Sequence, residues 1–188
     1  MAKRHPSLVS LSHDHHHGLA LALRLRQGDK ALLNDGWTHD RREQATHLQK
    51  FYQEELRPHF ASEEQVLFPA MKEHIPQSVA LIDSLVRQHR EMEDLIRTIS
   101  SAGTVDPGGL LVSFGEILEQ HIRLEERELF PMYEAVMPGG IARNIQVEID
   151  RMQIGMKMEQ NESPVAKSKT QGETLDRTQT SRTADRRG

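Results

Sequence analysis

The sequence predicts an all-α protein whose main part is an up-down-up-down four-helix bundle, followed by a short C-terminal helix and a disordered tail. Three observations lead to this prediction. Apolar residues recur every three or four positions in four long stretches, as on the buried face of a helix. Mostly short connections containing turn residues join these stretches, which favours antiparallel packing of neighbouring helices. Each stretch also carries one histidine near the middle of its apolar face.

Length and composition are those of one ordinary globular domain with an unusual number of histidines. Of 188 residues, 36% are apolar and 28% are charged, whereas eleven residues are histidine and none is cysteine. The absence of cysteine excludes disulfides and thiolate metal sites, so imidazole and carboxylate are the metal-binding groups that remain. The formal net charge of −4 gives no sign of nucleic-acid binding. Because no stretch has the length of a membrane span or the form of a secretory signal, we expect a soluble, cytoplasmic protein with neither membrane nor nucleic acid as a partner.

The first helix is predicted from Ser10 to about Gln27 and ends before a glycine. Residues 13–17 read His-Asp-His-His-His and hold more histidines than one site can use. His15 is the preferred ligand because its face of the helix is the more apolar, and His16 is the second choice. The apolar residues on the face of His15 are Leu8, Leu11, Leu19, Ala22 and Leu23.

Residues 28–38 carry turn residues at both ends and are expected to form the longest internal connection. A second helix is predicted from about His39 to Phe68. Pro58 lies inside it and is expected to kink it, while Pro69 should bend or end it. A third helix is predicted from Pro76 to about Ser100.

The fourth helix is predicted to begin at Asp106 and Pro107, a good pair for an N-cap and a first helical residue. Pro131 should bend or end it. A shorter amphipathic helix follows, and the polar sequence after it is expected to be disordered. The predicted boundaries are 1–135 for the bundle, 136–158 for the accessory helix and 159–188 for the disordered tail.

One pattern occurs in both the second and the fourth helix: His, three residues, Glu-Glu, two residues, then Leu-Phe-Pro. Residues four apart lie side by side on a helix, so His59 with Glu63 and His121 with Glu125 each present an imidazole beside a carboxylate. Apolar residues flank both pairs at helical spacing, which predicts that the pairs are buried. Burying unpaired carboxylates costs roughly several kcal/mol each, against a total stability of about 5–15 kcal/mol, so a bound cation is the expected partner.

The third helix contributes His89, in the middle of its apolar stripe, with Glu93 four residues further on. Whether Glu93 is a ligand stays open, because no Leu-Phe-Pro sequence follows it. Four imidazoles and two or three carboxylates are too many for one ion, so we predict two metal ions bridged by Glu63 and Glu125. The candidate metal ligands are His15, His59, Glu63, His89, Glu93, His121 and Glu125, and no catalytic residue is predicted.

From about residue 8 to residue 135 the chain resembles the hemerythrin-like family, the HHE cation-binding domains. The resemblance rests on the segment 12–19, the two repeated motifs and Gln88-His89. It implies a four-helix bundle that holds two non-heme iron ions, joined by an oxo or hydroxo bridge. Glu63 and Glu125 would be bridging ligands, and the four histidines would be terminal ligands. Ferritin-like bundles instead place glutamate and histidine three residues apart, a spacing absent from these repeats.

Two departures from the oxygen-carrying members of this family bear on function. Those members have a histidine where this chain has Glu93. They also place an aspartate five residues after the fourth-helix histidine, where this chain has Glu125 after four. Because an added carboxylate favours ferric iron, reversible oxygen carriage is not predicted.

The resemblance favours a di-iron protein that binds or senses O2 or NO, or that handles iron or peroxide under oxidative stress. Binding is favoured over catalysis, and weak oxidase, peroxidase or NO-reducing activity stays open. One alternative is donation of iron to damaged iron–sulfur clusters, although relatives with that role generally carry an extra cysteine-bearing segment and this sequence has no cysteine. A structural bundle with an incidental metal site is the other. A homodimer or an unidentified protein partner also stays open.

Overall fold

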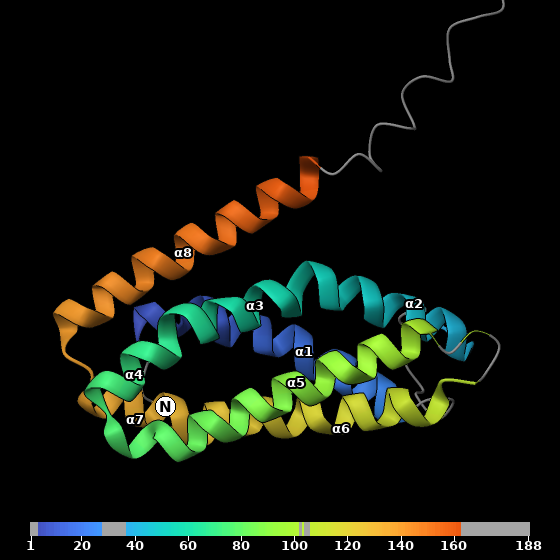
Figure 1. The fold of residues 1–188 in the computed structure, drawn as a ribbon, viewed down its shortest axis with the longest axis horizontal. Coiled ribbons are helices and arrows are strands. Elements are labelled where there is room, and N and C mark those ends of the chain that lie inside the picture. Colours follow the sequence, from blue (N-terminus) through green and yellow to red (C-terminus); the bar gives the residue numbers. More distant parts are fainter. Residues whose placement is uncertain (1–3, 28–36, 102, 104–105, 163–188) are drawn as a thin grey trace, which may run out of the picture.

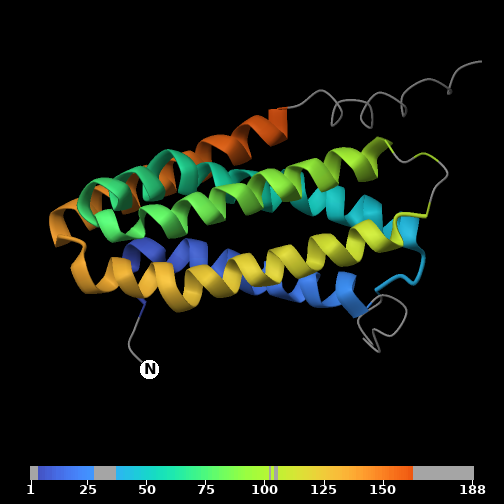
Figure 2. The same cartoon turned by 60° about the horizontal axis from the view of Figure 1, so that its bottom comes forward.

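The protein folds into four long helical rods that lie side by side, with a further helix packed on the outside (Figures 1 and 2). The computed structural model describes residues 4–27, 37–101, 103 and 106–162, and all regular structure in these residues is helical. The predicted all-α bundle is therefore confirmed. Within this part of the chain no helix combines the length and apolarity that a membrane crossing requires.

Each rod is a nearly continuous run of helical turns, and successive rods run in opposite directions (Figure 2). The first consists of a 3₁₀ turn, η1 (Pro6–Leu8), and α1 (Val9–Gln27). The third consists of η5 (Pro76–Ser78) and α5 (Val79–Ser101). The second rod consists of α2 (Arg41–Phe51), η3 (Tyr52–Leu56), α3 (Arg57–Ser62), η4 (Glu63–Leu67) and α4 (Phe68–His74). The fourth rod consists of α6 (Gly108–Leu124), η6 (Glu125–Leu129) and α7 (Phe130–Val136). The outer helix is α8 (Gly139–Glu162).

Three prolines lie inside the second and fourth rods, yet neither rod ends at them. A π-helical turn precedes each proline: η3 before Pro58, η4 before Pro69 and η6 before Pro131. In η4, for example, the Phe68 N–H donates to the carbonyl of Glu63, five residues back. The wider turn accommodates the proline, which cannot donate a hydrogen bond and would crowd the preceding turn of an α-helix. The predicted helix end at Phe68 is therefore wrong, because the rod continues through His74.

The other helix boundaries differ from the prediction by short distances. The first helix begins at Val9, behind a 3₁₀ turn, and Leu23 is 43% exposed although its spacing predicted burial. At the start of α6, Asp106 acts as a cap because its carboxylate accepts the Gly108 N–H at 2.9 Å. Residues 28–36, most of the predicted long connection, lie outside the described part of the chain.

Helix α8 leaves α7 at one end of the bundle and runs back along the outside of the second rod (Figure 1). It packs against η1, α3 and η4 through the buried side chains of Ala142, Ile145 and Ile149. The helix extends to Glu162, past the predicted boundary at residue 158. The rest of the predicted disordered tail, 163–188, is outside the described residues.

The apolar core is divided into two clusters, one toward each end of the bundle. One cluster includes Leu25, Leu48 and Phe114, and the other includes Leu11, Met71 and Tyr133. Along every rod the residues of the two clusters are separated by a short polar section. Among the described residues, all the buried histidines and glutamates lie in or next to these sections: His15, His59, Glu63, His89, His121 and Glu125.

Helices α1 and α6 approach each other closely because two glycines, Gly18 on α1 and Gly115 on α6, lie at their contact. A Cβ atom built on Gly115 would lie 2.8 Å from the backbone oxygen of Ala22 and 3.1 Å from the Cβ of Leu25. The backbone oxygen cannot move away without moving α1. The glycine is therefore required for the spacing that brings the ligands on α1 and α6 together.

We expect Gly115→Ala to lower the free energy of unfolding by about 1–3 kcal/mol, because the added methyl group forces α1 and α6 apart. Gly109→Ala on the same helix is the matched control, since nothing lies within 4 Å of its added Cβ. That control should be neutral or stabilising by up to about 1 kcal/mol. Urea denaturation of both variants measures the difference, and equal stabilities would contradict this account of the helix spacing.

Candidate metal centre

Four histidines, one from each rod, point one ring nitrogen into the polar layer between the two core clusters. They lie on α1, α3, α5 and α6, and none is more than 3% exposed. The Nε2 atoms of His15 and His59 are 3.2 Å apart, and those of His89 and His121 are 3.1 Å apart. The histidines therefore form two pairs.

Two fully buried carboxylates join these pairs. The oxygens of Glu63 lie 3.1 Å from the Nε2 of His59 and 3.4 Å from the Nε2 of His89. One oxygen of Glu125, Oε2, lies 3.1 Å from the Nε2 of His15 and 3.3 Å from the Nε2 of His121. Each carboxylate thus contacts one histidine of each pair, which is the arrangement expected of a ligand shared by two ions.

All four oxygens of Glu63 and Glu125 lack a hydrogen-bond partner. The neighbouring imidazole nitrogens are close enough for electrostatic attraction, but none of these contacts has the alignment of a hydrogen bond. Buried polar atoms are normally hydrogen-bonded, and unpaired buried carboxylates are strongly destabilising. These unpaired oxygens fit a bound cation.

The outward nitrogen of every histidine has a polar partner. The Nδ1 atoms of His15 and His59 contact carboxylates of Glu126 and Asp14 at 2.7 and 3.1 Å. The Nδ1 atoms of His89 and His121 contact Glu64 at 2.8 Å and the side-chain oxygen of Gln88 at 3.1 Å. Because these partners accept hydrogen bonds, Nδ1 of each of these four histidines is the nitrogen that donates, which leaves the inward Nε2 as the nitrogen available to a cation.

These four outer partners were not predicted, although the sequence contained a signal for them. Asp14 and Gln88 each precede a ligand histidine, and Glu64 and Glu126 each follow a ligand glutamate. Each outer partner thus supports a ligand on another rod. The second glutamate of the repeated Glu-Glu pair was the clearest clue, since a repeat that needs one ligand has no evident use for two acids.

The buried groups hold protons unequally. Burial alone raises the pKa of Glu63, but the positive charges of the adjacent His59 and His89 bring that pKa well below its usual range. Burial and the negative charge of Glu63 raise the pKa of Glu125 to about 7. Burial and the positive charge of His89 hold the pKa of His121 well below its ordinary value. At neutral pH Glu63 is therefore the ionised carboxylate, and Glu125 is close to its midpoint.

The pKa values of Glu126 and His59, at the edge of the site, are shifted by their polar partners. Burial raises the pKa of Glu126, but hydrogen bonds from His15 and Ser12 lower it to about 2. Burial lowers the pKa of His59, yet the charge of Glu63 and the hydrogen bond to Asp14 raise that pKa well above its ordinary value. Carboxylate partners therefore strengthen the histidines as electron donors to a cation.

Aromatic rings and a small cavity adjoin the ligands. Phe60 stacks on the ring of His89 at 3.9 Å between centroids, and Phe130 stacks on His15 at 5.4 Å. A cavity of about 10 Å³ lies beside the site, which is roughly enough for one small molecule. The cavity is lined by Asp14, His15, Leu56, His59, Phe60, Leu118, His121 and Ile122.

Of the seven predicted ligands the structure brings six together and leaves Glu93 apart. Among the described residues, His15, His59, Glu63 and Glu125 form one group with all ligand atoms within 4.8 Å, and Glu63, His89 and His121 form another. The carboxylate of Glu93 instead accepts a hydrogen bond from Arg90 at 2.8 Å. The alternative first-helix candidate, His16, is exposed, whereas His15 is buried.

The donor set fits transition metals better than other cations. Each histidine pair supplies two imidazole nitrogens, and the two glutamates supply four oxygens, with no sulfur. Imidazole suits iron, zinc, copper and nickel, whereas magnesium and calcium prefer oxygen alone. Two ions sharing Glu63 and Glu125 would use every unpaired oxygen.

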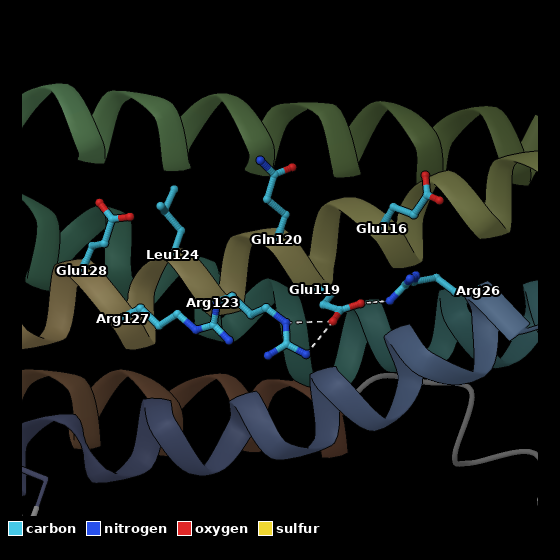
Figure 3. A pocket seen from close by; sticks show the side chains of 8 residues that line it. All are labelled: Arg26, Glu116, Glu119, Gln120, Arg123, Leu124, Arg127 and Glu128. Carbon is cyan, nitrogen blue, oxygen red and sulfur yellow. Dashed lines mark hydrogen bonds and ion pairs between the residues drawn. The ribbon is translucent and has the colours of Figure 1, made fainter.

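A surface pocket of about 450 Å³ lies away from this centre along α6 and η6 (Figure 3). Arginine and glutamate side chains line it in equal number. Glu119 pairs there with both Arg26 and Arg123, so its charge is already balanced. Size alone does not identify the functional site in this protein.

Comparison with known protein families matches residues 7–133 to the hemerythrin HHE cation-binding domain. Neither the curated proteins nor the solved structures include a significant match to the chain. The matched region begins in η1 and ends in α7, so it contains all four ligand histidines and both buried glutamates.

Removing the charge of Glu125 should stabilise the protein when no metal is bound, in a pH-dependent way. A folded-state pKa of about 7, above the ordinary 4.5, means that proton binding stabilises the fold below about pH 4.5 and that this stabilisation is lost as pH rises through 7. Glu125→Gln should therefore raise the free energy of unfolding by about 1–3 kcal/mol at pH 8 and by no more than about 1 kcal/mol at pH 5.

Urea denaturation of chelator-treated protein at both pH values measures this gain. Glu128→Gln is the control, because Glu128 is an exposed acid on the same π turn and its replacement should change little at either pH. A gain for Glu125→Gln of equal size at pH 5 and pH 8 would contradict the raised pKa.

Proposed function

The chain belongs to the hemerythrin HHE cation-binding domain family, and from that premise we propose that it holds two non-heme iron ions and binds or senses O2 or NO with them. One observation carries the proposal: four inward Nε2 atoms and four unpaired carboxylate oxygens converge in a buried layer. Zinc suits similar donors, so the choice of iron rests on the family. We also propose that the protein acts in the cytoplasm.

Open coordination positions support a role in binding a small ligand. If Glu63 and Glu125 each give one oxygen to each ion, every iron has four protein ligands, two nitrogens and two oxygens. Iron sites with histidine and carboxylate ligands commonly retain open positions for exogenous molecules. When bound, the two irons would supply those positions and a change of oxidation state.

The small cavity supports a diatomic ligand over a larger one. It lies against three of the four histidines, and its other walls are mostly apolar, formed by Leu56, Phe60, Leu118 and Ile122. A cavity volume of about 10 Å³ excludes all but very small molecules. O2 and NO are small and weakly polar, which fits these walls. Peroxide remains a second candidate ligand, because Asp14 gives the cavity one polar wall.

The surrounding residues have defined roles in this proposal. The outer partners Asp14, Glu64, Gln88 and Glu126 hold the proton on Nδ1 of each histidine, which keeps Nε2 free for iron. The stacked rings of Phe60 and Phe130 restrict the movement of the imidazoles and exclude water. A second copy of the chain or an unidentified protein is the proposed recipient of a signal from this site.

Iron content is the first test of this function. Protein produced with excess iron should contain about two irons per chain, and Glu63→Gln should contain fewer than about one, because the amide keeps only one of the two ligand oxygens and removes the negative charge that both ions share. Glu93→Gln is the matched control and should retain both irons, since its carboxylate is paired with Arg90. Metal analysis after gel filtration gives the counts.

Iron content well below two in the unchanged chain would contradict the di-iron proposal. A structural bundle with an incidental metal site would instead bind zinc and iron without preference and show no spectral response to oxygen. We expect near-ultraviolet absorption from ferric iron that is absent after exchange for zinc. Ready transfer of the iron to a metal-free cluster protein would favour the repair function.

Filling the cavity should separate ligand binding from iron binding. Leu118→Phe adds carbon atoms to a cavity wall without touching a metal ligand, so iron content should remain at about two per chain. Its affinity for NO, measured by absorption titration of the ferrous protein, should fall at least about tenfold. Ile117→Phe is the control, because Ile117 is a half-buried neighbour that does not line the cavity. Unchanged NO affinity in Leu118→Phe would show that the ligand binds elsewhere.

A further inference from the structure

A second pocket, of about 210 Å³, opens on the surface next to the buried centre. It lies between α1, the η3–α3 part of the second rod, and α8. Its side chains are acids, histidines, one proline and one glutamine, with no lysine or arginine among them. They are His13, Asp14, His17, Glu54, Glu55, Pro58, His59 and Gln153.

Two exposed histidines in this pocket are placed to bind one cation together. His13 and His17 are four residues apart on α1, and their rings lie 4.9 Å apart between centroids. Two histidines at this spacing on one helical face are a known way of binding a transition metal. The Nδ1 of His17 also lies 3.2 Å from a carboxylate oxygen of Glu55, which would supply a third ligand. Since these side chains are exposed, small rotations suffice to close them on an ion.

The two histidines and the glutamate are not part of the internal repeat that relates the two halves of the bundle. The ligand pair Asp14-His15 on α1 corresponds to Gln88-His89 on α5, and the same alignment sets His13 and His17 against Arg87 and Glu91. The motif repeat sets Glu55 against Ile117. The other side of the bundle thus has one arginine, one glutamate and an isoleucine where this side has two histidines and a glutamate. The pair of surface histidines beside a glutamate therefore occurs at only one of these two corresponding positions.

The surface pocket is also connected to the buried centre through shared walls. Asp14 and His59 line both the surface pocket and the internal cavity, and their side chains contact each other at 3.1 Å. Asp14 is partly exposed, while His59 is buried and lies 3.1 Å from Glu63. Gln153 of α8 reaches the same carboxylate of Asp14 at 3.4 Å. A cation at the surface thus has a carboxylate between it and the first buried ligand.

We propose that His13, His17 and Glu55 form a surface site for a divalent transition-metal ion, which then passes by Asp14 to His59 and the buried centre. The transfer step rests on the proposed di-iron function, whereas binding at the surface site does not. The nearby carboxylates of Asp14, Glu54 and Glu55 attract cations to the pocket and raise their local concentration. The opposite side of the bundle has no such site, because its outer partner is the neutral Gln88 and Arg87 repels cations.

Binding of an additional ion tests the surface site directly. Isothermal titration of Zn²⁺ into protein already loaded with iron should show one further ion per chain, with a dissociation constant of about micromolar order. The double variant H13A/H17A should lose this ion. H16A is the matched control, because His16 is an exposed histidine on the same helix that does not line the pocket, and it should keep the ion. Absence of the further ion from the unchanged protein, or its persistence in H13A/H17A, would overturn the proposal.

The rate of iron uptake tests the transfer. With limiting Fe²⁺, metal-free H13A/H17A and Glu55→Gln should load iron at least about fivefold more slowly than the unchanged protein and H16A, yet reach the same final iron content. Equal loading rates with full final content would overturn the transfer route while leaving the di-iron function intact. Low final content in every variant would instead count against the di-iron function. In that case the Zn²⁺ titration still decides the surface site, because H13A/H17A should bind one zinc fewer than H16A.

Discussion

The burial of two carboxylates among four imidazoles is the constraint on which the rest of the structure depends. Glu63 and Glu125 are completely buried with four unpaired oxygens, so the fold contains a strongly unfavourable layer unless a cation compensates for it. The two apolar clusters on either side stabilise the bundle and hold this layer in place. The apolar clusters at the two ends of the bundle thus offset the cost of the polar layer between them.

Several features of the fold position the ligands rather than adding to the core. The π turns η4 and η6 begin at Glu63 and Glu125, and they allow each rod to continue past a proline. Gly115 brings α6 close to α1, so that His121 and Glu125 meet His15. The outer carboxylates then fix which ring nitrogen faces inward. Helix geometry, helix spacing and proton position are all set before any metal binds.

The two halves of the site are similar but not equivalent. His59 contacts Asp14, whereas His121 contacts Gln88. The charge of Glu63 and the hydrogen bond to Asp14 raise the pKa of His59 despite its burial, while burial and the charge of His89 lower the pKa of His121. The half with Asp14 also faces the pocket where His13 and His17 lie. The side proposed for metal uptake thus carries His13, His17 and Asp14, whereas the corresponding residues on the other side are Arg87, Glu91 and Gln88.

The sequence by itself determined the helical class, the repeated motif and seven candidate ligands, six of which converge, because helical spacing relates local sequence to one face of a helix. It could not determine that the Glu93 carboxylate pairs with Arg90, because the helical spacing of Glu93 fits a metal ligand and a partner of Arg90 equally well. It could not show that the rods continue past Pro69 and Pro131, because a π turn depends on packing that holds the distorted helix in place. The pairing of each of the four buried histidines with a polar side chain on a different rod, and the cavity beside these histidines, came only from the tertiary structure. Contacts between rods depend on how the helices pack, which no single helix encodes.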